Sequence, residues 1–113
     1  MPDPVVRVEE GVSFSVIAPA GFRILAAIDA AAKKLGFDLT ITSACDGMHS
    51  GPEDPHHKGE AYDVRSHDCP DKDYAFQTIM SSLSDEHFWG WLEAKGELNE
   101  HFHIQRRKGT TYP

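Results

Sequence analysis

The chain has 113 residues, of which 40% are hydrophobic and 26% charged, a balance typical of a globular protein and too apolar for a disordered one. This length suits one domain, so we expect residues 1–113 to form a single unit. The 18 Asp and Glu outnumber the 11 Lys and Arg. The resulting net charge of −7 argues against nucleic acid as a partner, because nucleic acid is bound by clustered Lys and Arg.

No apolar run approaches the roughly 20 residues that span a bilayer, so we expect no membrane span. The first residues, MPDPVVRVEEG, lack the basic and apolar regions of a secretory signal. The sequence therefore predicts a protein that is cytoplasmic as synthesised, and that lysis would release if it derives from a phage. We also expect it to be a monomer.

The first half of the sequence predicts a strand, a helix and a second strand. Residues 12–18 are β-branched and aromatic, which is typical of a strand or an extended arm. From Pro19 the apolar residues recur at helical spacing until Gly36, which suits the left-handed cap at the end of a helix. Residues 37–44 then alternate apolar and polar side chains, as in a half-buried strand.

The second half begins with a loop at residues 45–60, which is rich in Gly, Pro, Asp and Ser. A loop of this length in a small domain is often functional. The later expected elements are short strands at 61–66, 88–92 and 102–106, the last two forming a hairpin, and a helix at about 71–83. Of Trp89 and Trp91, we expect one in the core and the other beside a cleft. The order predicts an α+β domain with a mostly antiparallel sheet and helices packed on one face.

All seven histidines lie between His49 and His103. Histidine is the commonest metal ligand and the usual acid–base group near neutral pH. His56 ends the loop and Asp63 lies on the following strand. Gly59 between them permits a sharp turn, so the two side chains can converge.

The last strand can complete such a site. His101 and His103 share one face of it, because side chains alternate across a sheet. A catalytic zinc site uses three N or O ligands from the protein and keeps one position open. One or both of these histidines therefore join His56 and Asp63 in a predicted metal site.

Two half-motifs resemble the zinc signatures of the D-Ala-D-Ala carboxypeptidase and L-alanyl-D-glutamate endopeptidase family of zinc peptidases. The first is His-x-x-Gly-x-Ala-x-Asp, at His56, Gly59, Ala61 and Asp63. The second is Glu-x-x-His, at Glu100 and His103. The wider fold group includes lysostaphin-type endopeptidases and the Hedgehog signalling domain. The resemblance covers about residues 20–105 and implies a Hedgehog/DD-peptidase-like fold.

The resemblance also implies the roles of four side chains, and a fifth, His101, has a role that the chemistry allows. It implies that His56, Asp63 and His103 bind Zn²⁺. It implies that Glu100 is the general base towards a water molecule on the metal, while His101 stabilises the oxyanion or is the base instead of Glu100. The implied activity is that of a zinc metallopeptidase, a carboxypeptidase or endopeptidase that hydrolyses a peptide, by default a peptidoglycan stem peptide of the bacterial cell wall.

The sequence departs from this family at the end of the strand before the loop, where members commonly carry Ser-x-x-Arg. Ser43 matches and is expected to contact substrate, but Asp46 stands where the arginine is expected. Arg65, on the face of Asp63, or Arg23, from the first helix, would then have to supply the positive charge.

Several alternatives stay open. A shift of one residue in register would make His57 the ligand instead of His56. The protein could be a non-catalytic, zinc-containing binding module of the same fold, or a metal-free domain. Cys45 and Cys69 are expected to be reduced, partly buried thiols. A structural zinc held by these two cysteines with His49 and His67 is a further alternative, although its spacing is poor.

Overall fold

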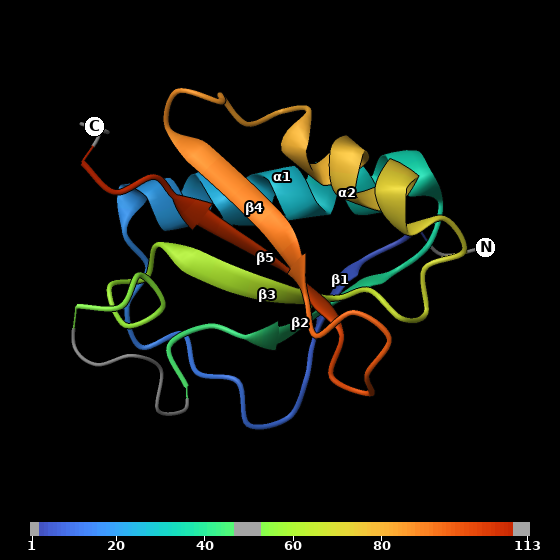
Figure 1. Cartoon of the computed structure of the whole chain (residues 1–113), viewed down its shortest axis with the longest axis horizontal. Helices are drawn as coiled ribbons and strands as arrows, with labels where there is room; N and C mark the ends of the chain where they lie inside the picture. The colour runs from blue at the N-terminus through green and yellow to red at the C-terminus, as the bar shows by residue number, and fades with distance from the viewer. Residues whose placement is uncertain (1–2, 47–52, 110–113) are drawn as a thin grey trace.

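A five-stranded sheet organises the described part of the chain, residues 3–46 and 53–109 of a computed structural model (Figure 1). Its strands are β1 (Val6–Val8), β2 (Leu39–Ser43), β3 (Ala61–Arg65), β4 (Phe88–Glu93) and β5 (His101–Arg106). The helices are α1 (Pro19–Leu35) and α2 (Lys72–Met80). The spatial order is β1-β2-β3-β5-β4. The β1–β2 pair is parallel and the other three neighbouring pairs are antiparallel, so the domain is α+β with a mixed sheet.

Of the two alternatives predicted for residues 12–18, the structure shows the extended arm and not the strand; β1, which the sequence did not predict, lies beside β2. The backbone of the arm is held at separate points. The amide of Cys45 donates to the carbonyl of Ser13 at 2.8 Å, and the amide of Ala18 donates to that of Gly59 at 3.2 Å. These bonds fix the arm against the loops on either side of the candidate site rather than in a ladder.

Helix α1 follows the predicted boundaries. It begins with Pro19 in its first turn and ends before Gly36, whose φ of 83° is the left-handed cap. Helix α2 begins after Asp71, whose side chain accepts a hydrogen bond from the amide of Tyr74, and it ends at Met80, three residues before the predicted end. Within the described ranges, no helix is long and apolar enough to cross a membrane.

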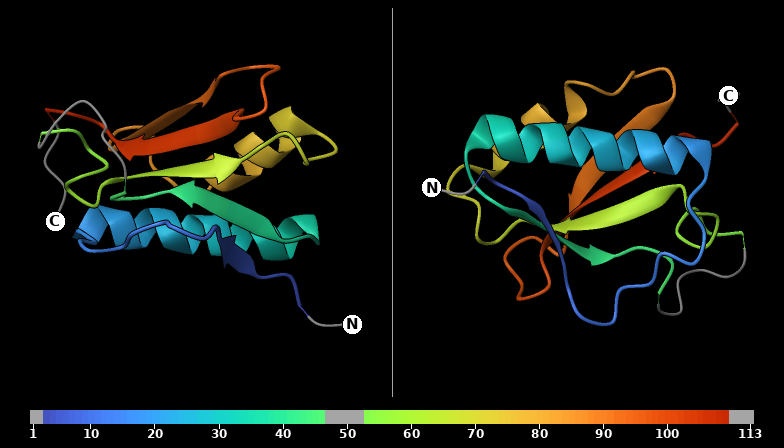
Figure 2. Two further views of the ribbon diagram at one scale, coloured as in Figure 1. Left: turned by 90° about the horizontal axis from the view of Figure 1, so that it is seen from below. Right: turned by 180° about the vertical axis from the view of Figure 1, so that it is seen from behind.

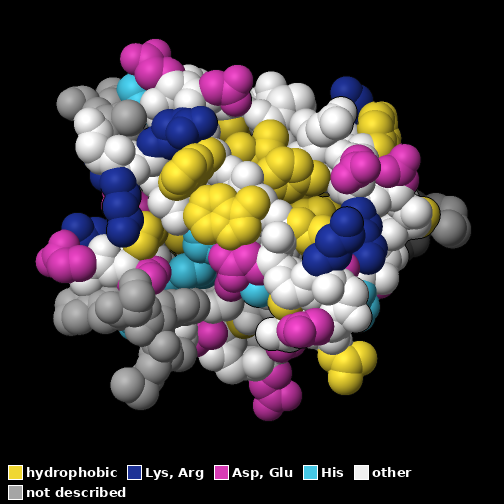
Figure 3. All heavy atoms as spheres, viewed as in Figure 1, with side chains coloured by type: hydrophobic (Ala, Val, Ile, Leu, Met, Phe, Trp, Pro, Cys, Tyr) yellow, Lys and Arg dark blue, Asp and Glu magenta, His cyan; other side chains and the backbone are white. Residues whose placement is uncertain are grey.

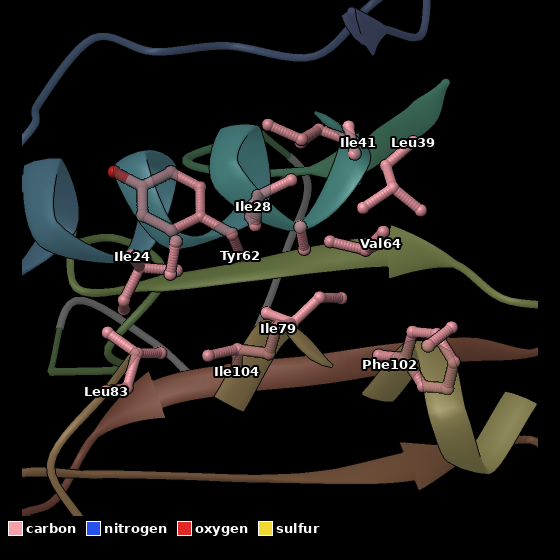
Figure 4. Packing of buried hydrophobic residues seen from close by; sticks show 14 of the residues in the cluster. Ile24, Ile28, Leu39, Ile41, Tyr62, Val64, Ile79, Leu83, Phe102 and Ile104 are labelled. Carbon is pink, nitrogen blue, oxygen red and sulfur yellow. The ribbon is translucent and has the colours of Figure 1, made fainter. Parts of the chain in front are cut away.

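Helix α1 packs along one face of the sheet (Figure 2), and the core lies between the sheet and the two helices. Figure 4 shows how buried side chains of the two central strands meet those of the helices. The residues concerned are Tyr62 and Val64 of β3, Phe102 and Ile104 of β5, Ile24 and Ile28 of α1, and Ile79 of α2. Because these strand residues alternate with their neighbours, the residues between them face the other side of the sheet.

That other face carries three rows of side chains across β3, β5 and β4. The rows are Ala61, Gln105 and Trp89, then Asp63, His103 and Trp91, then Arg65, His101 and Glu93. In the middle row, Asp63 is 8% exposed and His103 is 7% exposed. Buried ionisable groups outside an apolar core are uncommon and usually have a partner or a function.

Candidate metal centre

His56, Asp63 and His103 converge on one point of this face. Asp63 Oδ1 lies 3.2 Å from His56 Nε2 and 2.9 Å from His103 Nδ1. The two imidazole nitrogens are 3.3 Å apart, and all three side chains are buried. The three could hold a metal ion, because one ligand atom from each lies within 4.8 Å of the others. The structure thus brings together the three residues predicted as ligands, with His56 rather than His57 in this group.

A tight turn before β3 positions His56. The amide of His56 donates to Asp54 Oδ1 at 2.9 Å, and the amide of Gly59 donates to the carbonyl of His56 at 3.1 Å. Gly59 has a φ of 71°, which confirms the sharp turn expected at this residue. A Cβ atom there would lie 2.4 Å from the carbonyl oxygen of Val16, so the arm at residues 12–18 packs directly on the turn.

The proton on the His56 ring is placed by a backbone carbonyl. Nδ1 of His56 lies 2.9 Å from the carbonyl oxygen of Ala44. A carbonyl oxygen only accepts hydrogen bonds, so Nδ1 must carry the proton. In the neutral ring, Nε2 therefore directs its lone pair towards Asp63 and His103, which is the tautomer that binds a metal ion.

Gln105 fixes the other imidazole in the same way. The side-chain nitrogen of Gln105 donates to the carbonyl of Arg106 at 3.1 Å, which leaves Oε1 of its amide free to accept. This Oε1 lies 2.8 Å from Nε2 of His103, so Nε2 donates to it. Nδ1 of His103 is then the nitrogen with the lone pair, and it points at Asp63.

With both rings neutral, two lone pairs and a carboxylate oxygen therefore meet, and a ring must take up a proton before it can donate a hydrogen bond to Asp63. Burial by itself raises the pKa of Asp63, but hydrogen bonds with His103 and His56 outweigh it and hold this pKa well below its usual range. Burial lowers the pKa of His103, but its bonds to Asp63 and Gln105 raise it above its ordinary value overall. The arrangement calls for a positive charge, which a shared proton or a cation can supply. Two imidazoles and a carboxylate are a donor set that suits zinc and other divalent transition metals.

His101 lies beside this triad. Its Nε2 is 3.5 Å from Asp63 Oδ2 and 3.3 Å from Glu93 Oε2, and its Nδ1 is 2.7 Å from the carbonyl oxygen of Asn99. Glu93 also accepts a hydrogen bond from Trp91 Nε1 at 2.8 Å. Sequence analysis missed Glu93. The pairing of Glu93 with His101 across the hairpin could have indicated it, but that register depends on a turn whose residue Ala94 adopts a positive φ of 54°.

The carboxylate of Glu100 is held by a set of polar contacts. Its carboxylate accepts hydrogen bonds from Ser66 Oγ at 2.7 Å, from Lys72 Nζ at 2.9 Å and from the amide of Gly96 at 2.9 Å. Glu100 directly precedes the first residue of β5 and is 2% exposed, and these contacts hold its carboxylate next to the start of α2. Glu100 also lines the cleft that contains Asp63 and His101, so its role as general base stays a prediction. Its contacts join β5, the hairpin turn and the start of α2.

These contacts predict a pH-dependent contribution of Glu100 to stability. Lys72, the amide of Gly96 and the hydroxyl of Ser66 lower the pKa of Glu100 from its ordinary 4.5 to about 2. A lowered pKa in the folded state stabilises the protein above pH 4.5, and the benefit is lost as the pH falls towards about 2. We expect Glu100→Gln to be less stable than the wild type at pH 6, with a gap that narrows steadily between pH 4.5 and pH 2. Urea unfolding across this range measures the gap, and a gap independent of pH would contradict the expectation.

The residues expected to bind substrate lie on both sides of the sheet. Arg65 lies on the face of Asp63 and pairs with Glu9 at 2.6 Å. Together with Ser43 and His101 it lines a cleft of about 360 Å³ next to the triad. Arg23 instead donates to the carbonyl of Ser82, on the helix side of the molecule. Of the two arginines considered, Arg65 is the one beside the candidate site.

Asp46 has a structural role in the turn after β2. Its side chain accepts hydrogen bonds from the amide of Ala44 at 2.8 Å, from the amide of Ser13 at 3.2 Å and from Ser43 Oγ at 3.2 Å. These bonds overcome the effect of burial and lower the pKa of Asp46. The carboxylate thus closes the turn after β2 and ties it to the N-terminal arm.

The structure confirms the prediction for the two cysteines but not the prediction for the two tryptophans. Cys45 and Cys69 are both free thiols, as expected, and burial raises the pKa of Cys69 to about 11. His49, which the alternative structural zinc site requires, lies outside the described residues. Trp89 and Trp91 are 42% and 37% exposed, so the expectation that one is in the core is wrong. Being two residues apart in β4, both must lie on the open face.

Comparisons with protein-family models, with curated proteins and with solved structures found no match for this chain.

Proposed function

We propose that the protein is a zinc-dependent peptidase of Hedgehog/DD-peptidase-like fold that hydrolyses a short peptide, with a peptidoglycan stem peptide as the default substrate. The observation that supports this best is that His56, Asp63 and His103 converge in a buried position. The carbonyl of Ala44 orients the ring of His56, and Gln105 orients the ring of His103, so that a lone pair of each ring points towards Asp63. The two half-motifs that resemble zinc-peptidase signatures support the same function.

The neighbouring residues suit the chemistry of hydrolysis. A divalent ion held by the triad would polarise the scissile carbonyl and make a bound water molecule more acidic. In this proposal His101 accepts the proton from the attacking water and returns it to the leaving amine. Glu93, 3.3 Å from His101 Nε2, stabilises the imidazolium that forms. Arg65 and Ser43 bind the substrate from the polar cleft on the other side of Asp63.

Two substitutions test this division of roles. We expect His101→Gln to lower kcat/KM by at least about 100-fold, the usual loss when an acid–base group is removed, while the metal stays bound. Glu100→Gln should keep activity within about threefold near neutral pH, where its effect is on folding stability. The measurements are metal content by elemental analysis and cleavage of D-Ala-D-Ala and L-Ala-D-Glu peptides by zinc-loaded protein. An inactive Glu100→Gln with an active His101→Gln would reverse the two roles.

A second candidate is a binding module that holds its metal without catalysis. The contacts of Glu100 and Asp46 favour it, because Lys72 already pairs with the Glu100 carboxylate and Asp46 supplies no positive charge where the resemblance implies an arginine. Metal content and peptide cleavage, measured together, distinguish the two candidate functions. Retention of about one metal ion per chain, with no cleavage of either peptide class at any pH between 5 and 9, would support the binding module.

A further inference from the structure

Two exposed tryptophans lie on the open face of β4, an edge strand of the sheet. The rings of Trp89 and Trp91 meet edge to face, with centroids 5.3 Å apart. Figure 3 shows hydrophobic side chains gathered on this face beside histidine and acidic side chains, with Lys and Arg at the border. Exposed aromatic side chains that gather in this way are typical of binding surfaces.

The tryptophan surface is continuous with the candidate metal centre. The ring of Trp91 lies 4.5 Å from that of His103, centroid to centroid. Gln105, which orients His103, also lines the cleft next to Trp89. A molecule bound over the tryptophans would therefore extend directly to the triad.

The cleft above these rings is positively charged. It has a volume of about 440 Å³ and is lined by Trp89, Trp91, Gln105, Arg107 and Lys108. We call it the tryptophan cleft. Among these described lining residues there are two cations and no carboxylate, although the whole chain carries a net charge of −7. The guanidinium of Arg107 lies 4.9 Å from the centre of the Trp89 ring, and its Nε donates to the carbonyl of Asp85. The cation is thus held in place at the rim.

We propose that the tryptophan cleft binds the C-terminal carboxylate end of a short peptide. Arginine and lysine bind a carboxylate through charge-assisted hydrogen bonds, so Arg107 and Lys108 would take the carboxylate. The apolar side chain of the terminal residue would lie against the tryptophan rings. This deepens the proposed function and rests on it in one respect. With its C-terminus held here, a peptide presents a bond close to that terminus to the triad, which makes the activity that of a carboxypeptidase.

Fluorescence tests the binding without any need for cleavage, because Trp89 and Trp91 are the only tryptophans in the chain. The probe is N-acetyl-dialanine with a free carboxylate, compared with its C-terminal amide and with acetate, and the signal is read seconds after mixing. We expect the tryptophan fluorescence to change in a saturable way with the free acid. The amide should bind at least about tenfold more weakly, because it cannot form the charge-assisted hydrogen bonds of a carboxylate. Acetate should also bind at least about tenfold more weakly, because it lacks the apolar contacts with the tryptophan rings.

Substitutions locate the ligand. Arg107→Gln and Lys108→Gln should each weaken binding of the free acid about fivefold to tenfold. Lys34→Gln, which removes an exposed lysine in the last turn of α1, should leave it unchanged. Trp89→Phe and Trp91→Phe each leave one reporter, and both single-tryptophan proteins should still respond. Lys108→Gln is the more informative of the two charge variants, because the backbone amide and side chain of Arg107 also hold the fold together.

The results separate this proposal from the proposed function. Equal binding of acid and amide, or binding insensitive to both charge variants, would overturn the tryptophan cleft as a carboxylate site. Hydrolysis of amidated peptides as fast as of free acids would also overturn it, while leaving the peptidase function intact. Carboxylate-specific binding by a protein that cleaves no peptide would support the cleft and reject the peptidase.

Discussion

Replacing Asp63 by Asn should weaken metal binding by more than about 100-fold. Losing an outer partner of a metal ligand typically costs 10–100-fold, and Asp63 is itself the one anionic member of the triad. Its Oδ1 lies within 3.2 Å of both imidazole nitrogens, so a cation held by the two rings would also contact this charge. Asparagine keeps the size of the side chain but removes the charge that draws a cation between the two rings.

The measurement is elemental analysis after dialysis, followed by titration of zinc in competition with a coloured chelator. The matched control is Asp29→Asn, which removes an aspartate that pairs with Lys33 on the outer side of α1. We expect about one metal ion per chain in the wild type and the control, and little or none in Asp63→Asn. Unchanged affinity in Asp63→Asn would refute the metal centre itself, and with it the proposed function.

Replacing Gly59 by Ala should destabilise the fold by about 2–5 kcal/mol. The left-handed conformation of Gly59, with a φ of 71°, costs an ordinary residue about 1–2 kcal/mol. The added Cβ would also lie 2.4 Å from the carbonyl oxygen of Val16, and relieving such overpacking costs a further 1–3 kcal/mol or so. Because Gly59 lies between His56 and Asp63, movement of this turn should also weaken metal binding.

Gly36 provides a matched control for the steric part of this effect. It has a similar φ of 83°, but a Cβ there would meet nothing within 4 Å. Gly36→Ala should therefore lose only the conformational part, about 1–2 kcal/mol. Unfolding in urea measures both variants, since the midpoint reports stability when the slope is unchanged. An equal loss of stability in Gly59→Ala and Gly36→Ala would show that there is no close steric contact between the arm at residues 12–18 and the turn before β3.

The parts of the structure that sequence analysis predicted well depend on local rules. Apolar spacing and the two punctuating residues Pro19 and Gly36 define α1, and the structure has the same boundaries. Alternation placed His101 and His103 on one face of β5, and the spacing of His56 from Asp63 fitted a single tight turn. Each of these predictions needs only neighbours in the chain, so tertiary contacts had little chance to change them.

The parts it could not predict depend on contacts between distant segments. The sequence did not predict β1, because its pairing with β2 depends on tertiary packing. The contacts of Glu100 come from Ser66 and Lys72, which lie 34 and 28 residues away in the sequence. The partnership of Glu93 with His101 likewise needs the register of the β4–β5 hairpin. Sequence analysis therefore predicted the three residues of the triad but not the side chains around them.

Gln105 gives the two sites a common element. Its amide accepts from His103 on one side and borders the tryptophan cleft on the other. A ligand in the tryptophan cleft that rotated this amide would break the hydrogen bond of His103 Nε2 and change the basicity of His103 Nδ1. Because such coupling is reciprocal, a metal ion bound by the triad would then change the affinity of the tryptophan cleft for its ligand by the same factor.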